Sequence, residues 1–507
     1  MNVFILILYT FALFSVSQGG IGDWWDILWG GTKNIFFDLW NRHPASRSLY
    51  KYLDVDVKPC DNFYKFACGK WIRTKELEFR DSKWIVKKVA NTNFDIFRRG
   101  NIYCVVIYLF SEALKGKYND ESPAIHTYYK LHEKCEDLSG DESEECKQKI
   151  MEFGVYALSS LFIKKNMIKN EYNKTFDLVK KLMFDRIKEE FKLLIDEKHA
   201  LFDEETRKHY LHKLKTMKFK KNFDLYDISN VELMEECYKK TAFLLSKPKI
   251  KTILSDLEFQ KNKLSKKHKK FDLSSCEDKI FYYDEFFSTY VTSNGAYSEL
   301  VNIFIINSDA LNEPSFSKDF PTSLNYGGLG FTIAHEILHG FDNKNDSKTI
   351  YGDNKNEFEI TEKSNDKFKE KKYCFVEQYG EEKHSLTDKK MNGSMALAEN
   401  IADNGGIKIA HRAYIKWLKS NGGKDIEVPA FKEYTNEQLF FIGLGTNFCE
   451  YITKDELERN IETDEHSPGE IRLNVLLSNY KPFSDAFNCP VGSGMNSKKR
   501  CEVWKNH

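Results

Sequence analysis

The chain has 507 residues, of which 41% are hydrophobic and 14% aromatic. A chain of this length and composition can fill a large core and is long enough for more than one domain. Lys and Arg together number 76, as do Asp and Glu, so the formal net charge is +0. This balance gives no indication of a polyanionic partner, and we expect a globular protein that binds no nucleic acid.

The first predicted element is an export signal. Residues 3–16 form an apolar run that is short for a bilayer span but suits a secretory signal peptide. Small residues follow at 15–17, so we predict a signal peptide over residues 1–17 with cleavage near Ser17. No basic segment precedes the run, which leaves an uncleaved membrane anchor, with the rest of the chain outside the cell, as the alternative. In both cases the bulk of the chain is exported.

Cysteine usage agrees with export. The chain has 11 cysteines, which favours an oxidising compartment and disulfide bonds. Those near the C-terminus are too widely spaced for a zinc knuckle. The odd count leaves at least one thiol free or bonded to another chain. Asn173, Asn345 and Asn392 each begin an Asn-x-Ser/Thr site, so we expect a secreted glycoprotein.

Three further segments follow in chain order. Residues 18–59 form an aromatic-rich extension, which we expect to dock on the body of the protein because it lacks the basic face of an interfacial helix. Residues 60–285 are helical and charge-laced, most clearly over 173–221, where an apolar stripe predicts a buried face. The pattern changes near residue 286, where a short β-type run at 302–306 leads into a glycine-rich segment. We predict a catalytic domain over residues 286–507.

A metal-binding motif, His-Glu-Ile-Leu-His, occupies residues 335–339. On a helix His335 and His339 share a face and can reach one metal, and Glu336 lies beside the position of a bound water. A catalytic zinc takes three protein ligands, and Glu399 is the best candidate for the third. Asp403, four residues further on, would hold the second nitrogen of a ligand histidine. Each motif alone also fits an ordinary amphipathic or solvated helix. Two helices that together supply the ligands and the supporting carboxylate of one metal site favour one Zn²⁺ per chain.

Five motifs occur in order in the second half of the chain: NYGGLG at 325–330, HEILHGFD at 335–342, ENIADNGG at 399–406, DEHSPG at 464–469 and CEVW at 501–504. This order resembles the neprilysin and endothelin-converting-enzyme family of zinc metallopeptidases, closely over 286–504 and more loosely before that. The resemblance implies a mainly α (α+β) fold, with a thermolysin-like zinc metallopeptidase catalytic domain and a helical lid domain over 60–285. It also implies a metalloendopeptidase that hydrolyses internal bonds of peptides.

The resemblance implies a role for each site residue. Glu336 would take a proton from a zinc-bound water and later deliver it to the leaving amine. His466, oriented by Asp464, would stabilise the oxyanion that develops in the transition state. Arg472 would contact the substrate carbonyl.

Substrate-binding positions are also implied. Asn294 and Gly295 fall where the family has an Asn-Ala pair that hydrogen-bonds an extended substrate like an added strand. Ala310, Ser315 and Thr332 fall where family members tend to have larger apolar residues around the pocket for the residue after the cut. These departures put the family's preference for a bulky hydrophobic residue there in question.

The chain is shorter than members of this family, and much of the helical lid is expected to be missing between about residues 147 and 153. We hypothesise that larger substrates can enter than in the full-length relatives. The resemblance also implies three disulfides: Cys60–Cys489, Cys68–Cys449 and Cys374–Cys501. The family partner of Cys135 would lie in the missing region, so five cysteines stay unassigned: Cys104, Cys135, Cys146, Cys237 and Cys276.

Two other functions remain open from the sequence. The chain could be a secreted, zinc-binding but inactive relative that acts as a binding or decoy protein. It could also be a zinc aminopeptidase, which would need an acidic anchor for the substrate amine, and no motif for such an anchor is present.

Overall fold

The computed structural model describes residues 43–81, 113, 115–169, 171–221, 227–245, 247–267, 274–281, 295–299, 301–342 and 360–504. The predicted signal peptide, residues 18–42 of the extension, Cys104, Asn294 and Asn345 lie outside these ranges. Within them, no helix is both long and apolar enough to cross a membrane.

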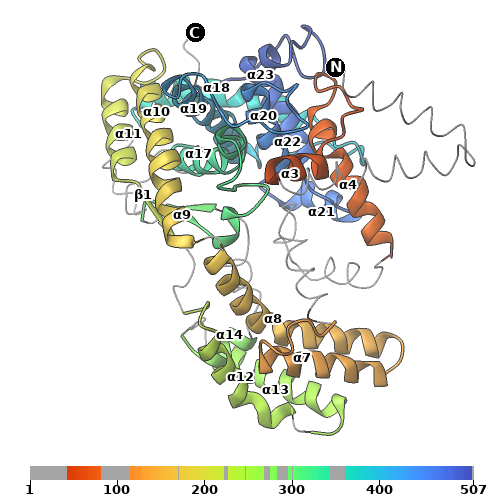
Figure 1. Cartoon of the computed structure of the whole chain (residues 1–507). Helices are drawn as coiled ribbons and strands as arrows, with labels where there is room; N and C mark the ends of the chain where they lie inside the picture. The colour runs from red at the N-terminus through yellow and green to blue at the C-terminus, as the bar shows by residue number, and fades with distance from the viewer. Residues whose placement is uncertain are drawn as a thin grey trace, which may run out of the picture.

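The described residues form two bodies that lie one above the other (Figure 1). The helices of the upper body are α3 (Pro44–Tyr52), α4 (Phe63–Asp81), α9 (Tyr172–Val179), η3 (Lys180–Phe184), α10 (Asp185–Asp196), α11 (Glu204–Thr216), η4 (Ser308–Leu311), α16 (Thr322–Asn325), η5 (Tyr326–Gly330), α17 (Phe331–His339), α18 (Glu362–Gly380), α19 (Leu397–Ser420), α20 (Asn436–Asn447), α21 (Lys454–Thr463), α22 (Gly469–Asn479) and α23 (Lys481–Ala486). Those of the lower body are α7 (Pro123–Lys134), η2 (Cys135–Asp137), α8 (Asp141–Lys169), α12 (Val231–Leu245), α13 (Ile250–Lys267) and α14 (Cys276–Phe281). This content confirms the predicted mainly α (α+β) class.

One small sheet lies beside the catalytic helices. Its strands are β1 (Lys218–Lys221), β2 (Gly295–Ser298) and β3 (Ile303–Ile306), in the order β1-β3-β2. The central strand β3 is the β-type run found in the sequence, and its Phe304 and Ile306 are buried on alternate positions. β1 pairs with it in parallel and β2 antiparallel, so among the described strands β2 lies at an edge.

The packing does not follow the predicted boundary at residue 285. Helix α10 packs against α19, and β1 pairs with β3. The buried Trp504, near the C-terminus, also contacts the ring of Phe191 in α10 at a centroid distance of 5.2 Å. Residues 172–221 therefore belong with the C-terminal body, and residues 60–285 are not one packing unit.

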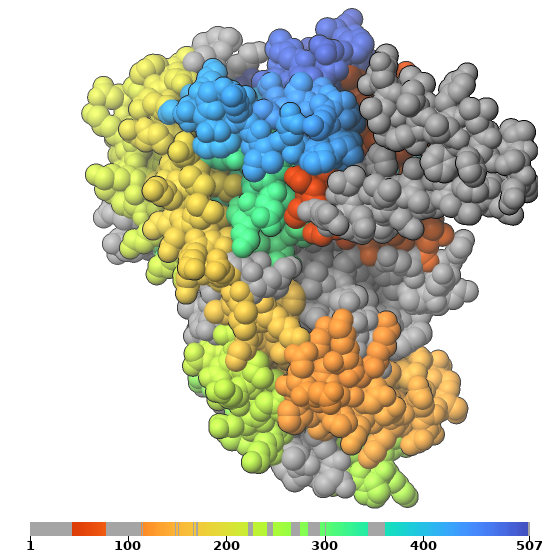
Figure 2. Space-filling view, viewed as in Figure 1, coloured from red at the N-terminus to blue at the C-terminus, as the bar shows by residue number. Residues whose placement is uncertain are grey.

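Helix α8 connects the two bodies. It is 29 residues long and runs without a break through residues 147–153, where the lid was expected to be interrupted. It packs against α7, α12 and α14 in the lower body and against α9 and η4 of the upper body. In Figure 2 its residues are visible between the two bodies. The lower body is thus a small group of helices connected to the upper body by one continuous helix.

Five disulfides link the described cysteines. The three pairs implied by the family resemblance are confirmed: Cys60–Cys489, Cys68–Cys449 and Cys374–Cys501. The expectation for Cys135 was wrong, because it bonds Cys146 at the start of α8. Cys237 bonds Cys276, so only Cys104 is without an assignment.

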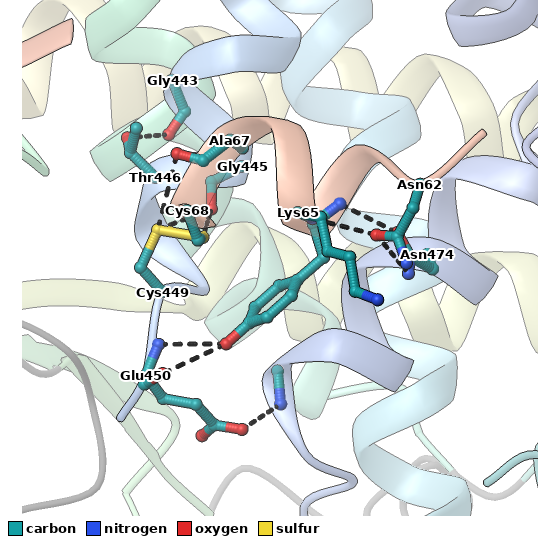
Figure 3. Close-up of a disulfide and its surroundings, with 12 residues drawn as sticks. Asn62, Lys65, Ala67, Cys68, Gly443, Gly445, Thr446, Cys449, Glu450 and Asn474 are labelled. Carbon is teal, nitrogen blue, oxygen red and sulfur yellow. Dashed lines mark hydrogen bonds between the residues drawn. A yellow bond between two sulfur atoms is a disulfide. The ribbon is translucent and has the colours of Figure 1, made fainter. Parts of the chain in front are cut away.

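The Cys68–Cys449 disulfide fastens α4 to the end of α20 (Figure 3). Beside it the Tyr64 hydroxyl donates to the Glu450 carbonyl at 3.2 Å and accepts from the Glu450 N–H at 3.3 Å. The Tyr64 N–H donates to the side-chain oxygen of Asn474 in α22 at 3.0 Å. Helix α4 is therefore fastened to α20 and α22, two other helices of the upper body.

Removing this disulfide is expected to lower the free energy of unfolding by about 2–4 kcal/mol, because the bond restricts a long loop in the unfolded chain. The variant is Cys68→Ser with Cys449→Ser, and the measurement is the melting temperature in the presence of zinc. Cys135→Ser with Cys146→Ser is the matched control, since those cysteines are only 11 positions apart. An equal or larger fall in the control would contradict the prediction.

Candidate active site

Helix α17 carries the HExxH motif through the centre of the upper body. It continues directly from η5, and all its residues are buried except Thr332 and His339, which are partly exposed. His335 and His339 lie one turn apart on the same face, with ring centroids 4.5 Å apart. Helix α19, which packs against α17, presents Glu399 in its first turn.

The three predicted metal ligands converge. One ligand atom from each of His335, His339 and Glu399 lies within 4.8 Å of the other two. The two Nε2 atoms are 3.0 Å apart. Glu399 places Oε2 3.2 Å from Nε2 of His335 and Oε1 3.3 Å from Nε2 of His339. Two imidazoles and one carboxylate are a donor set typical of catalytic zinc sites.

Both imidazoles have an aspartate oxygen close to their other nitrogen. Asp403 lies 2.8 Å from Nδ1 of His335, as the sequence predicted. Asp342 lies 2.8 Å from Nδ1 of His339, a contact that the sequence analysis did not identify. With the ring protons at Nδ1, the lone pairs of both Nε2 atoms face each other at a distance where neither can donate to the other. The donor set therefore fits a shared cation.

The electrostatics of the cluster also suit a cation. Burial opposes the charged form of His335, but Asp403 and Glu399 outweigh it and raise the pKa of that imidazole. Burial likewise opposes ionisation of Glu399, yet the neighbouring His339 and His466 hold its pKa well below the usual range. Four carboxylates, those of Glu336, Asp342, Glu399 and Asp403, are buried together, and Arg472 contacts two of them, Asp403 and Glu399. A divalent cation would balance this excess of negative charge.

Glu336 is fixed against the edge of the sheet. Its Oε2 accepts a hydrogen bond from the backbone N–H of Tyr297 in β2, at 2.8 Å. Gly295 begins this strand, and a Cβ there would meet the Phe304 ring at 2.6 Å. This contact explains why glycine stands where alanine was expected. Asn294, the other predicted substrate-binding residue, lies outside the described residues.

His466 contacts the cluster through Glu399 and is partly exposed. Its Nδ1 is 2.9 Å from Oδ1 of Asp464, the orienting contact that the sequence predicted. Its backbone N–H also donates to that oxygen at 2.8 Å, and its Nε2 is 3.0 Å from Oε2 of Glu399. The ring is about one third exposed, at 31%, so it can reach a molecule bound at the cluster.

The guanidinium of Arg472 contacts two of the buried carboxylates. Its Nε and Nη2 each donate to an oxygen of Asp403 at 2.7 Å, and Nη2 lies 3.5 Å from Oε2 of Glu399. The guanidinium is nearly buried, at 9% exposure. Its predicted contact with a substrate carbonyl stays a prediction, whereas its pairing with Asp403 is a contact that the sequence analysis missed.

A mainly helical fold with an HExxH helix, a carboxylate from a second helix and an aspartate behind each histidine is the arrangement typical of zinc metallopeptidases. Residues 294–503 match the model of Peptidase family M13. This match and the curated relatives below support the resemblance to the neprilysin and endothelin-converting-enzyme family of zinc metallopeptidases that was drawn from the five motifs.

Two curated relatives illustrate the match. The chain is 34% identical over 360 residues to Neprilysin-1 of Caenorhabditis elegans, covering 69% of this chain and 44% of that protein. It is 37% identical over 211 residues to Endothelin-converting enzyme 1 of Rattus norvegicus, covering 42% of this chain and 27% of that protein. The chain thus spans less than half the length of these relatives.

Solved structures share the fold at low identity. Zinc metalloprotease ZMP1 of Mycobacterium tuberculosis, in complex with inhibitor, matches with a TM-score of 0.53 and 20% identity, covering 73% of this chain and 52% of that chain. PepO from Lactobacillus rhamnosis matches with a TM-score of 0.51 and 19% identity, covering 72% and 52%.

Proposed function

We propose that this protein is a zinc-dependent endopeptidase that hydrolyses internal bonds of peptides. The observation that carries the proposal is the convergence of the ligand atoms of His335, His339 and Glu399 beside the carboxylate of Glu336. These three side chains would hold one zinc per chain. A bound zinc supplies a Lewis acid that lowers the pKa of a water and polarises a carbonyl.

Glu336 is assigned the proton transfers. Its carboxylate accepts a proton from the attacking water and delivers it to the leaving amine. The N–H of Tyr297 holds one carboxylate oxygen, which leaves the other oxygen for the proton. Among the described strands β2 lies at the edge of the sheet, where an extended substrate could be added, and Gly295 of this strand is a proposed hydrogen-bonding position; Asn294, outside the described residues, stays the other proposed position.

His466 is assigned the stabilisation of the oxyanion. Asp464 lies at Nδ1 and Nε2 faces the cluster, so a ring protonated at both nitrogens would direct its Nε2–H toward a substrate bound there. The Nε2–H can then donate to negative charge that develops on the scissile carbonyl. Arg472 and Asp403 act behind the ligands, since Asp403 orients His335 and Arg472 holds Asp403.

Export is part of the proposal. The described residues contain five disulfides, a number typical of chains that fold in an oxidising compartment. Asn173 and Asn392 are exposed and accessible to glycosylation. We therefore propose a secreted protein with a cleaved signal peptide over residues 1–17.

The test of the proposed function uses purified protein and peptides in two forms, one blocked at both termini and one with free termini. We expect cleavage at internal bonds of both forms, complete loss of cleavage after zinc is removed with 1,10-phenanthroline, and recovery when zinc is restored. Metal analysis is expected to give one zinc per chain. Cleavage only beside a free amine would identify an aminopeptidase, and zinc binding without turnover would identify a binding or decoy protein.

A further inference from the structure

One face of helix α17 is partly exposed next to the metal ligands, and we take this face as part of the wall of the active site. Thr332 and His339 are the two partly exposed residues of this helix, and they are seven positions apart. Seven residues make two helical turns, so both side chains lie on one face. The partly exposed positions of His339 and Thr332 therefore lie along the same face of α17.

Thr332 belongs to a hydrogen-bonded group of three side chains, which we call the polar trio: Ser315, Thr332 and Asn447. The Ser315 hydroxyl donates to Oδ1 of Asn447 at 3.0 Å, and Nδ2 of Asn447 donates to Oγ1 of Thr332 at 3.1 Å. Ser315 is buried, while Thr332 and Asn447 are partly exposed. Among the described residues, the Thr332 hydroxyl proton and the second amide proton of Asn447 find no acceptor.

The backbone holds the polar trio in place. The Ser315 carbonyl accepts the Leu329 N–H at 2.8 Å, and a Cβ at Gly328 would come within 2.4 Å of that same carbonyl oxygen. Glycine at this position therefore allows the Ser315 segment to lie directly against η5, the turn that leads into α17. The trio is a preformed part of the wall, because its members lie on elements packed closely against one another.

A second set of contacts ties the polar trio to the catalytic residues. Phe448, which follows Asn447, packs on Phe331 with ring centroids 5.5 Å apart. The Cζ atom of Arg472 lies 5.3 Å from the centroid of the same Phe448 ring. Phe448 thus connects the polar trio to α17, the helix that carries the two histidine ligands. It also connects the trio to Arg472.

We propose that the polar trio selects an uncharged, hydrogen-bonding side chain in the substrate residue next to the scissile bond, such as Asn, Gln, Ser or Thr. An apolar side chain packed there would cover the Thr332 hydroxyl and the Asn447 amide and leave their protons without acceptors, which costs binding free energy. The trio carries no formal charge, so it offers no counter-ion to an acidic or basic side chain. This inference rests on the proposed endopeptidase function.

The first test profiles a library of terminally blocked peptides in which the residues on both sides of the cleaved bond vary. Wild type is expected to favour Asn, Gln, Ser or Thr at one of the two positions. Thr332→Val with Asn447→Leu is expected to shift the ratio of kcat/KM for Gln over Leu at that position about tenfold toward Leu. Thr332→Ser retains the hydroxyl and should keep the wild-type ratio.

Thr446→Val is the matched control, because the Thr446 hydroxyl donates to the Gly443 carbonyl inside α20 and is buried. It should leave the ratio unchanged. A wild-type preference for Leu or Phe at both positions, or an unchanged ratio in Thr332→Val with Asn447→Leu, would overturn the inference.

The second test needs no turnover. Two peptide hydroxamates, which bind zinc, are made identical except for a Gln or Leu side chain beside the hydroxamate, and their Kd values for the zinc-loaded protein are measured by calorimetry. Wild type should bind the Gln compound about tenfold more tightly, and the double variant should lose this difference. A Gln preference without peptide cleavage would refute the proposed function and leave the polar trio supported. Cleavage with a Leu preference would refute only the trio, and binding of neither compound would count against both.

Discussion

Replacing Glu336 with glutamine is expected to lower kcat by about 10³-fold, within the range of 10²–10⁴ that general acid–base catalysis contributes. The glutamine amide keeps the size of the side chain but cannot accept a proton from water. Glu336 is not one of the three metal ligands, so zinc content should stay at the wild-type value. Initial rates on a blocked peptide and metal analysis of the same preparations measure the two quantities.

The matched control is Glu377→Gln, the same change at an exposed position of α18. It should retain the wild-type rate. If Glu336→Gln kept more than about a tenth of the wild-type kcat at full zinc occupancy, Glu336 would not be the general base.

Helical spacing explains why most of the candidate metal centre could be predicted from sequence. His335 and His339 are four residues apart on one helix, and so are Glu399 and Asp403 on another, which fixes the face that each pair shares. The contact of Asp342 with His339 was missed because Asp342 lies beyond the end of α17 at His339, where helical spacing no longer places a side chain. Its position in the HEILHGFD motif was the available signal.

Long-range packing explains what the sequence did not predict in the fold. Lys218 pairs with Ile303 across strands β1 and β3, and no local pattern indicates that pairing. This pairing places residues 172–221 in the upper body together with the C-terminal helices, whereas the sequence analysis placed a domain boundary at residue 285. The polar trio shows the same limit, because Ser315 and Thr332 were noticed as departures while Asn447, from the distant helix α20, was not.

Replacing Asp403 with asparagine is expected to have two effects. The first is a 10- to 100-fold loss of zinc affinity, since Asp403 orients the ligand His335. The second is a loss of about 3–5 kcal/mol in the free energy of unfolding of the zinc-free protein, because the buried guanidinium of Arg472 would lose its charged partner. Competition with a chelator measures the first effect, and thermal unfolding without zinc measures the second.

Asp342→Asn separates these two effects. Asp342 lies against His339 as Asp403 lies against His335, but Arg472 pairs with Asp403 and Glu399, so Asp342→Asn leaves the guanidinium its charged partner. This variant should therefore lose zinc affinity to a similar extent while its zinc-free form unfolds closer to the wild-type temperature. If both variants lowered the unfolding temperature equally, the Arg472–Asp403 pair would not be what stabilises α22 on α19. A larger fall for Asp403→Asn alone would show that the aspartate behind His335 also anchors α22, the helix that carries Arg472.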